Sequence, residues 1–209
     1  TLAAQLAGIP ARWGYGIGRS ARWLNRGSFL GRGARYQHPS SKMKVFADIN
    51  GFAPPELVWR ITTNASAKAA ATAFLQDHDI VVGAGSSPII TYGVGAMDTD
   101  RQWSPAAFAE VILAMRKAFP GITSVLVGAP SEQPVMEAIQ GRLPPESVVL
   151  SAMLSFDAAI DLLRRSLLFV GNDSSLLNIA AACDRPAIGL FAQSKPLDYN
   201  PNIKAVSVP

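Results

Sequence analysis

Residues 169–193 read FVGNDSSLLNIAAACDRPAIGLFAQ and contain a complete strand–helix–strand pattern. A short apolar run ends at Gly171, the polar residues Asn-Asp-Ser-Ser follow at 172–175, an alanine-rich helical stretch comes next, and a second apolar run covers 187–191. Both apolar runs are continuous rather than alternating, which is typical of a parallel sheet covered by helices on both faces. The stretch therefore predicts a strand–helix–strand unit with a dense polar cluster between its first strand and its helix.

From residue 88 onward the same alternation repeats with short loops. Ser104 is a suitable N-cap and Pro105 a suitable first helical residue, so a helix is expected to begin there. The predicted strands are 89–94, 122–127, 147–150, 167–170, 187–191 and 205–208, and the predicted helices are 105–119, 132–140, 156–165 and 174–183, with earlier helices near 20–25, 42–50 and 66–77. This order predicts a doubly wound α/β domain with a parallel sheet, in which ligands bind beyond the carboxyl ends of the strands.

The bulk composition limits the class of protein. The chain has 209 residues, of which 49% are hydrophobic, so it is long enough to bury a core. No apolar run approaches the roughly 20 residues needed to span a bilayer, and no signal peptide is visible. Cys183 is the only cysteine, which excludes an internal disulfide and fits a reducing cytoplasm; we expect it in the core. His38 and His78 lack metal-ligand companions, so no metal site is predicted.

Charge is distributed unevenly along the chain. Residues 1–47 contain eight basic residues and no acidic ones, whereas the rest contains 11 basic and 15 acidic residues. Aromatic residues, among them Trp13 and Trp23, lie between the arginines. Either this segment is a solvated, partly flexible arm, or it contacts an anionic partner such as a membrane surface or an acidic glycolipid. No recognised nucleic-acid motif accompanies the charge, so no nucleic-acid partner is expected.

Four of the predicted strand-to-helix loops carry candidate ligand-binding residues, and the fourth holds the polar cluster at 172–175. The loop after the first strand contains Gly95, which would let a ligand approach the backbone, and Arg101, which can meet a phosphate with two hydrogen bonds. Glu132 follows the second strand, where an acid can accept hydrogen bonds from ribose, and Met153 follows the third, where it could flank a base. The alternatives are a plain turn, a helix-dipole acid and a core methionine. The dinucleotide and P-loop fingerprints are absent.

The polar cluster at 172–175 is the strongest of these candidates. A single side chain would suffice to cap the helix, so Asn172, Asp173, Ser174 and Ser175 together exceed what capping needs. Free backbone amides at a helix start attract anions, and serine hydroxyls add donors. Asn178 lies one turn further along the same helix face. We therefore predict a site for a diphosphate and a sugar hydroxyl at this helix start.

These residues together resemble a known family. The stretch from Asp173 to 182 and the strand after Pro186 resemble the pattern D-[ST]-G-x-x-H-x-A-A-A…P-x-[IV]-x-L-[FY] of glycosyltransferase family 9, the ADP-heptose:lipopolysaccharide heptosyltransferases. Residues 100–104 resemble its K-x-W-P element, 128–132 its nucleotide-ribose element, and 7–14 the segment that closes its N-terminal domain. The order and spacing of these motifs match over nearly the whole chain.

The resemblance implies a GT-B fold whose C-terminal Rossmann-like domain holds the nucleotide-sugar and whose N-terminal domain holds the acceptor. Arg101, Ser174 and the neighbouring amides would hold the diphosphate, Glu132 the ribose, and Asp173 the donor-sugar hydroxyls, with Met153 near the base. No cofactor is implied, since a nucleotide-diphosphate sugar such as ADP-heptose is the substrate, and no metal is required if the arginine and the helix amides supply the positive field. The implied place is the cytoplasmic face of the inner membrane, where residues 1–47 would make a peripheral contact and face an anionic glycolipid acceptor.

Three departures from the family pattern qualify this prediction, and the most serious is that most of the N-terminal Rossmann-like domain is expected to be missing. Asn178 stands where the family has histidine, and Ser175 where it has glycine. We expect residues 1–78 to be a basic remnant of the acceptor domain and linker, and 79–209 to be the nucleotide-sugar-binding domain. The family's general base lies in the N-terminal domain, so no catalytic residue is assigned. The alternatives to a sugar transferase are a binding module without transfer activity and, ranked last, an enzyme such as a nucleotide-sugar epimerase.

Overall fold

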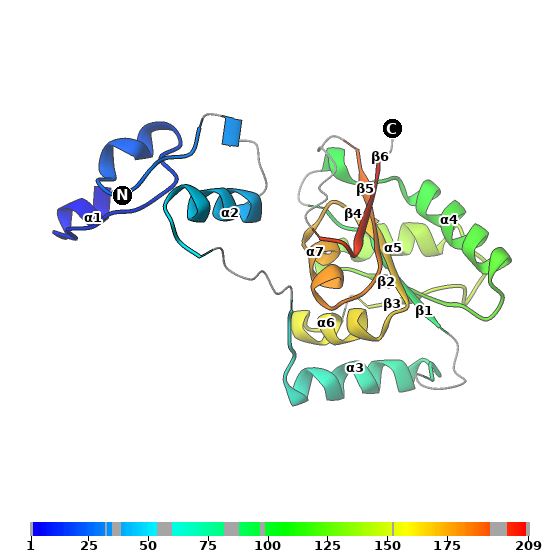
Figure 1. Cartoon of the computed structure of the whole chain (residues 1–209). Helices are drawn as coiled ribbons and strands as arrows, with labels where there is room; N and C mark the ends of the chain where they lie inside the picture. Colours follow the sequence, from blue (N-terminus) through cyan, green and yellow to red (C-terminus); the bar gives the residue numbers. More distant parts are fainter. Residues whose placement is uncertain are drawn as a thin grey trace. The chain divides into compact units, whose positions relative to one another are not determined.

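The computed structural model describes residues 2–31, 33–34, 39–53, 60–81, 88–96, 99–151, 153–192 and 200–207 (Figure 1). The chain divides into two compact units, Thr1–Val58 and Trp59–Pro209. The sequence predicted a domain boundary between residues 78 and 79, whereas the second unit starts at Trp59. The reason is that helix α3 (Ala65–Asp77) packs against helix α6 (Phe156–Arg165) of the same unit.

The second unit is built on a six-stranded sheet in the order β3-β2-β1-β4-β5-β6, and every neighbouring pair is parallel. The strands are β1 Ile89–Gly93, β2 Thr123–Val127, β3 Val149–Leu150, β4 Leu168–Asn172, β5 Ala187–Phe191 and β6 Ile203–Ser207. This is the strand order of doubly wound nucleotide-binding folds. The predicted parallel α/β sheet is confirmed. The chain leaves β1 toward one edge and β4 toward the other, so a topological switch point lies between these two strands.

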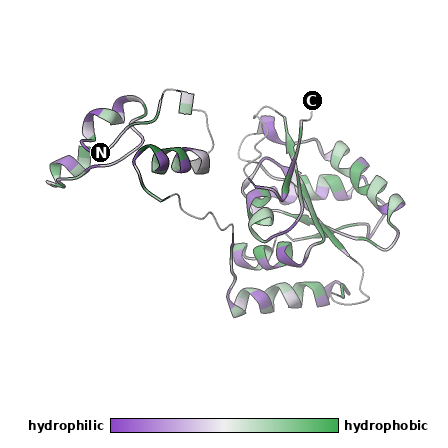
Figure 2. Ribbon diagram, viewed as in Figure 1, coloured by the Kyte–Doolittle hydropathy of each residue, from purple (hydrophilic) through white to green (hydrophobic). Residues whose placement is uncertain are grey.

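Helices cover both faces of the sheet, as Figure 1 shows. Helices α3, α6 and α7 (Ser175–Ala182) contribute to one core, while α4 (Pro105–Ala118) and α5 (Gln133–Gln140) contribute to the other. Successive strand residues alternate between the two cores; on β4, for example, Phe169 joins the first and Val170 the second. Both faces are therefore apolar, and Figure 2 shows the strands as predominantly hydrophobic. Continuous apolar runs in the sequence follow from this two-sided burial.

Local signals set the helix starts in the second unit. Ser104 accepts a hydrogen bond from the Ala107 amide at 3.2 Å and Pro105 is the first residue of α4, as predicted. β4, by contrast, continues to Asn172, two residues beyond its predicted end, because the Asn172 side chain is fully buried and hydrogen-bonded. The polar cluster therefore begins inside the sheet.

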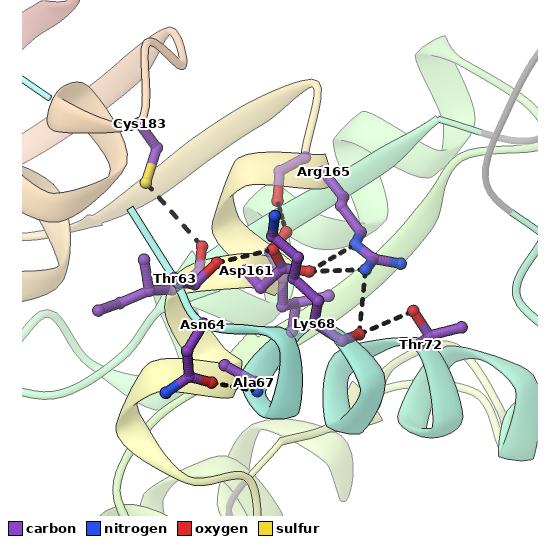
Figure 3. A network of polar contacts seen from close by, with 11 residues as sticks. Thr63, Asn64, Ala67, Lys68, Thr72, Asp161, Arg165 and Cys183 are labelled. Atoms are coloured by element: carbon purple, nitrogen blue, oxygen red, sulfur yellow. Dashed lines mark hydrogen bonds and ion pairs between the residues drawn. The ribbon is translucent and has the colours of Figure 1, made fainter. Parts of the chain in front are cut away.

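A polar network fastens the start of the second unit to α6 (Figure 3). The side chain of Asp161 is only 4% exposed and forms an ion pair with Arg165, in which Arg165 Nη2 lies 2.6 Å from Asp161 Oδ2. Thr63 donates to the other Asp161 oxygen at 3.1 Å, and Arg165 also donates to the Lys68 carbonyl of α3 at 3.2 Å. Cys183 is buried nearby, as predicted, and burial raises the pKa of its thiol. The buried pair of Asp161 and Arg165 thus joins Thr63 and Lys68 to α6.

The first unit contains the short helices α1 (Leu2–Leu6) and α2 (Pro39–Ile49) and the 3-10 helix η1 (Gly18–Trp23). Asn50 holds Ser28 from both sides: it accepts from the Ser28 amide at 2.6 Å and donates to the Ser28 carbonyl at 3.1 Å. Tyr15 meets Phe46 edge to face, with ring centroids 5.3 Å apart. Among the described residues of the chain, no helix has the length and apolar character needed to cross a membrane.

Candidate functional site

A cavity of about 470 Å³ opens in the second unit, where the loops that follow β1, β2, β3 and β4 meet. Its size lies within the range of small-molecule sites. The lining residues are Gly95, Ala96, Arg101, Val127, Gly128, Ala129, Pro130, Glu132, Leu154, Phe156, Ala159, Asp173, Ser174, Ser175 and Leu176. The cavity therefore lies at the carboxyl ends of the strands, around the switch point, where doubly wound folds bind their ligands.

The chemistry of the lining changes in the order of the strands across the sheet. The loop after β3 and the start of α6 contribute the apolar Leu154 and Phe156, and the loop after the neighbouring strand β2 contributes Glu132. The loops after β1 and β4 contribute Arg101 and the polar residues 173–175. By strand order, one end of the cavity is therefore apolar and the other carries the charged and polar groups together with Leu176, with a carboxylate between them.

An ion pair joins the two loops at the charged end. Arg101 Nη1 lies 3.8 Å from Asp173 Oδ2, and the side chains are 43% and 16% exposed respectively. Arg101 ends the 3-10 helix η3 (Thr99–Arg101) after β1, whereas Asp173 directly follows β4. The pair therefore spans the switch point and keeps a guanidinium beside the start of α7.

The start of α7 is not capped by its own N-cap side chain. Ser174 is the N-cap, in an extended conformation with φ −145° and ψ 175°, and its side chain makes no capping hydrogen bond. Its Oγ is buried and has no hydrogen-bond partner among the described residues. Backbone amides in the first turn of a helix lack partners within the helix. Because Ser174 and Ser175 line the cavity, these donors are available to an anion there.

Glu132 packs against two glycines. Its Oε2 accepts a hydrogen bond from the Ala129 amide at 2.8 Å, and a Cβ placed on Gly128 would lie 2.8 Å from the same oxygen. A Cβ on Gly95 would overlap the Glu132 carboxylate. The sequence suggested that Gly95 admits a ligand to the backbone. In the structure the missing side chain leaves room for the Glu132 carboxylate, which is thereby held at the middle of the cavity.

Asn172 joins β4 to the loop after β1. Its Nδ2 donates to the Val94 carbonyl at 2.7 Å, and its Oδ1 accepts from the Trp103 amide at 3.0 Å. Its side chain is fully buried and does not line the cavity. Within the same loop, Gln102 donates to the Ala96 carbonyl at 3.0 Å. These bonds hold both ends of the loop that carries Arg101. Asn172 therefore positions this loop from within the sheet.

The structure brings six of the nine predicted site residues to the cavity: Gly95, Arg101, Glu132, Asp173, Ser174 and Ser175. Asn172, Met153 and Asn178 do not line it. Met153 is 89% exposed, and Asn178 is exposed and donates to the Ser174 carbonyl at 3.0 Å. Sequence reasoning missed Phe156, although an aromatic first helical residue, directly after the N-cap Ser155 that ends a strand-to-helix loop, was a readable signal.

Metal ligands do not cluster in the part of the chain that the structure describes. No group of three or more histidine, cysteine, aspartate or glutamate side chains there is arranged to hold a metal ion. Among the described residues that line the cavity, Arg101 and the first amides of α7 supply the positive field.

Comparisons with known proteins place this chain in a family. The model of glycosyltransferase family 9 (heptosyltransferase) matches residues 2–208. Lipooligosaccharide heptosyltransferase 2 of Haemophilus influenzae is 34% identical over 122 residues, which cover 56% of this chain and 34% of that protein.

Two solved structures show the same fold. The E. coli ADP-heptose lps heptosyltransferase II is 22% identical with a TM-score of 0.71, over 98% of this chain and 64% of that chain. The E. coli heptosyltransferase WaaC with ADP-2-deoxy-2-fluoro heptose is 20% identical with a TM-score of 0.61, over 91% of this chain and 55% of that one. The chain thus spans between about a third and two thirds of the length of these relatives. Since the family model matches nearly every residue, this chain belongs to glycosyltransferase family 9 (heptosyltransferase).

Proposed function

We propose that the cavity binds a nucleotide-diphosphate sugar and that the protein transfers its sugar, a heptose, to a lipopolysaccharide-type acceptor. The observation that carries this proposal is the charged end of the cavity, where Arg101 and the uncapped start of α7 face the same space. A guanidinium and free helix amides are suitable partners for a diphosphate. ADP-heptose is the proposed donor because a solved relative, the E. coli ADP-heptose lps heptosyltransferase II, carries it in its name.

The remaining polar groups suit the other parts of such a donor. Glu132, held in place by the Ala129 amide, can accept hydrogen bonds from ribose hydroxyls through its carboxylate. Asp173 stands beside Arg101 at the far end of the cavity, where the sugar would follow the diphosphate, and its carboxylate can accept from sugar hydroxyls. The side chains at the cavity thus suit each part of the donor, and the donor itself is substrate rather than cofactor.

Transfer of the sugar leaves negative charge on the departing diphosphate. Preorganised donors that face this developing charge lower the barrier, and Arg101 with the α7 amides can supply them without a metal ion. A general base must also deprotonate the acceptor hydroxyl. None of the residues that line the cavity is assigned to that role here. Asn178, which replaces the family's histidine, lies outside the cavity lining, so leaving-group stabilisation is assigned to Arg101 and the amides.

The first unit is proposed to face the acceptor at the cytoplasmic side of the inner membrane. Its basic residues are accompanied by large apolar side chains that are at least partly exposed, including Leu2, Leu6, Trp13 and Phe29. Exposed apolar and basic side chains together favour anionic lipid surfaces. A peripheral contact with the membrane and an anionic glycolipid acceptor follow as parts of the proposal.

Titration calorimetry with ADP, GDP and UDP tests donor binding, and turnover with ADP-heptose and a lipopolysaccharide acceptor tests transfer. We expect ADP to bind. If no nucleotide binds, the proposed site is wrong. Binding without turnover would instead support the alternative of a nucleotide-sugar-binding module without transfer activity.

Replacing Arg101 by alanine should weaken binding of both ADP and ADP-heptose by about 1.5–3 kcal/mol, the scale of a hydrogen bond to a charged group. Replacing Asp173 by alanine should weaken ADP-heptose by a similar amount and ADP by less, because Asp173 is assigned to the sugar and acts on the diphosphate only through its ion pair with Arg101. The exposed Arg142, at the end of α5, provides a matched control when replaced by alanine. Unchanged ADP-heptose affinity in both site variants would contradict these roles.

A further inference from the structure

We infer that Phe156 is the platform on which the nucleobase of the donor stacks, with Leu154 and Pro130 as neighbouring apolar walls. This rests on the proposed function and deepens it, because it adds a residue that the sequence motifs did not indicate. Met153, the residue expected near the base, is 89% exposed and does not line the cavity, whereas Phe156 does.

Packing of α6 against the protein core does not require an aromatic residue at Phe156. The large apolar residues further along α6, Ile160, Leu162 and Leu163, are buried in the protein core. Phe156 is 60% exposed. It is the first residue of α6, and the N-cap Ser155 fixes this start by accepting from the Ala158 amide at 3.3 Å. The ring is therefore held on a rigid element, and much of it remains uncovered at the edge of a cavity.

The order of the loops places the base at this end. A nucleoside diphosphate consists of base, ribose and diphosphate in sequence. Across the sheet, the loop after β3 offers Phe156, the loop after β2 offers Glu132, and the loops after β1 and β4 offer Arg101 and the start of α7. Neighbouring strands lie roughly 4.8 Å apart, so these loops span roughly 14 Å. With the diphosphate at the charged end and the ribose at Glu132, the base reaches Phe156.

Stacking explains why an aromatic residue is suited to this position. A planar base has an apolar face that an aromatic ring can cover, and loss of such a contact by alanine substitution weakens binding roughly five- to 150-fold. Stacking does not read the hydrogen-bonding edge of the base. Phe156 is therefore expected to add affinity for the nucleoside part of the donor and to leave the diphosphate contacts unchanged.

The experiment compares ADP with inorganic pyrophosphate by titration calorimetry on the full chain. The variant Phe156→Ala should weaken ADP roughly five- to 150-fold and should leave pyrophosphate affinity unchanged, while Phe156→Trp should retain ADP affinity. Phe156→Leu, which keeps apolar area but not a ring, should fall between them. Phe119→Ala is the matched control, because Phe119 is similarly exposed, at 55%, and does not line the cavity.

The outcomes separate this inference from the proposed function. If the unaltered chain binds ADP and pyrophosphate but Phe156→Ala binds ADP equally well, the stacking role is wrong and the donor site stands. If Phe156→Ala weakens ADP and pyrophosphate by the same factor, the ring acts on the diphosphate end and the assignment is also wrong. If the unaltered chain binds neither, the donor site itself is wrong, and the stacking role is overturned with it.

Discussion

Replacing Arg165 by methionine is expected to lower the free energy of unfolding of the second unit by about 3–5 kcal/mol. The substitution leaves the carboxylate of Asp161, which is only 4% exposed, without the guanidinium that lies 2.6 Å from it. The hydroxyl of Thr63 remains as a donor at 3.1 Å, but it carries no charge. A buried charge without its partner costs far more than the intact pair contributes. The melting temperature should fall by roughly 6–20 °C.

Two further variants separate this cause from general damage. Arg142→Met makes the same chemical change at an exposed arginine whose guanidinium donates to the Ala138 carbonyl, and should change stability by less than about 0.5 kcal/mol. The double variant Asp161→Leu/Arg165→Met removes both charges and should recover most of the loss, because no unpaired charge remains. Urea unfolding curves measure all three. A double variant as unstable as Arg165→Met would show that packing, rather than the orphaned carboxylate, carries the effect.

The Asp161 network also shows which contacts cannot be predicted from the sequence. The apolar runs of the sheet could be predicted because the inner strands β1, β2, β4 and β5 are largely buried between two layers of helices, so most of their residues, such as Phe169 and Val170, are apolar. Asp161 and Thr63 are 98 residues apart, and no local pattern connects them. The boundary expected at residue 79 depended on local pattern alone, whereas this network and the α3–α6 packing place residues 60–78 with the second unit.

The same distinction applies to the candidate site. Arg101, Glu132 and the residues 173–175 were predictable because the topology of a parallel sheet brings strand-to-helix loops to one edge, whatever the intervening sequence. Which way each side chain points depends on contacts outside its own loop. Met153 was expected to face the base but is exposed, and Asn172 was expected in the site but turns into the sheet. Gly95 was read as space for a ligand and instead accommodates a carboxylate from another loop.

Asn172 provides the second large expected effect. Replacement by alanine leaves the Val94 carbonyl and the Trp103 amide without their hydrogen bonds. Each unsatisfied buried group costs about 1–3 kcal/mol, so the free energy of unfolding should fall by about 2–4 kcal/mol when one of the two finds partial solvation. Asn178→Ala makes the same change at an exposed asparagine whose side chain donates to the Ser174 carbonyl, and should be nearly neutral.

Binding distinguishes a positioning role for Asn172 from a purely structural one. Val94 and Trp103 flank the loop that carries Arg101, and Arg101 faces the proposed diphosphate. Freeing that loop means that binding must order it, at a cost of about 1 kcal/mol for each residue so ordered. Asn172→Ala should therefore weaken ADP by roughly fivefold or more at a temperature where the variant is still folded. Combining it with Arg101→Ala should add little further loss, because the positioned group is already gone. Substitutions of two residues that act through one another are not additive. If the two losses of ADP affinity add in full, or if ADP affinity is unchanged while stability falls, Asn172 therefore supports the sheet without orienting Arg101.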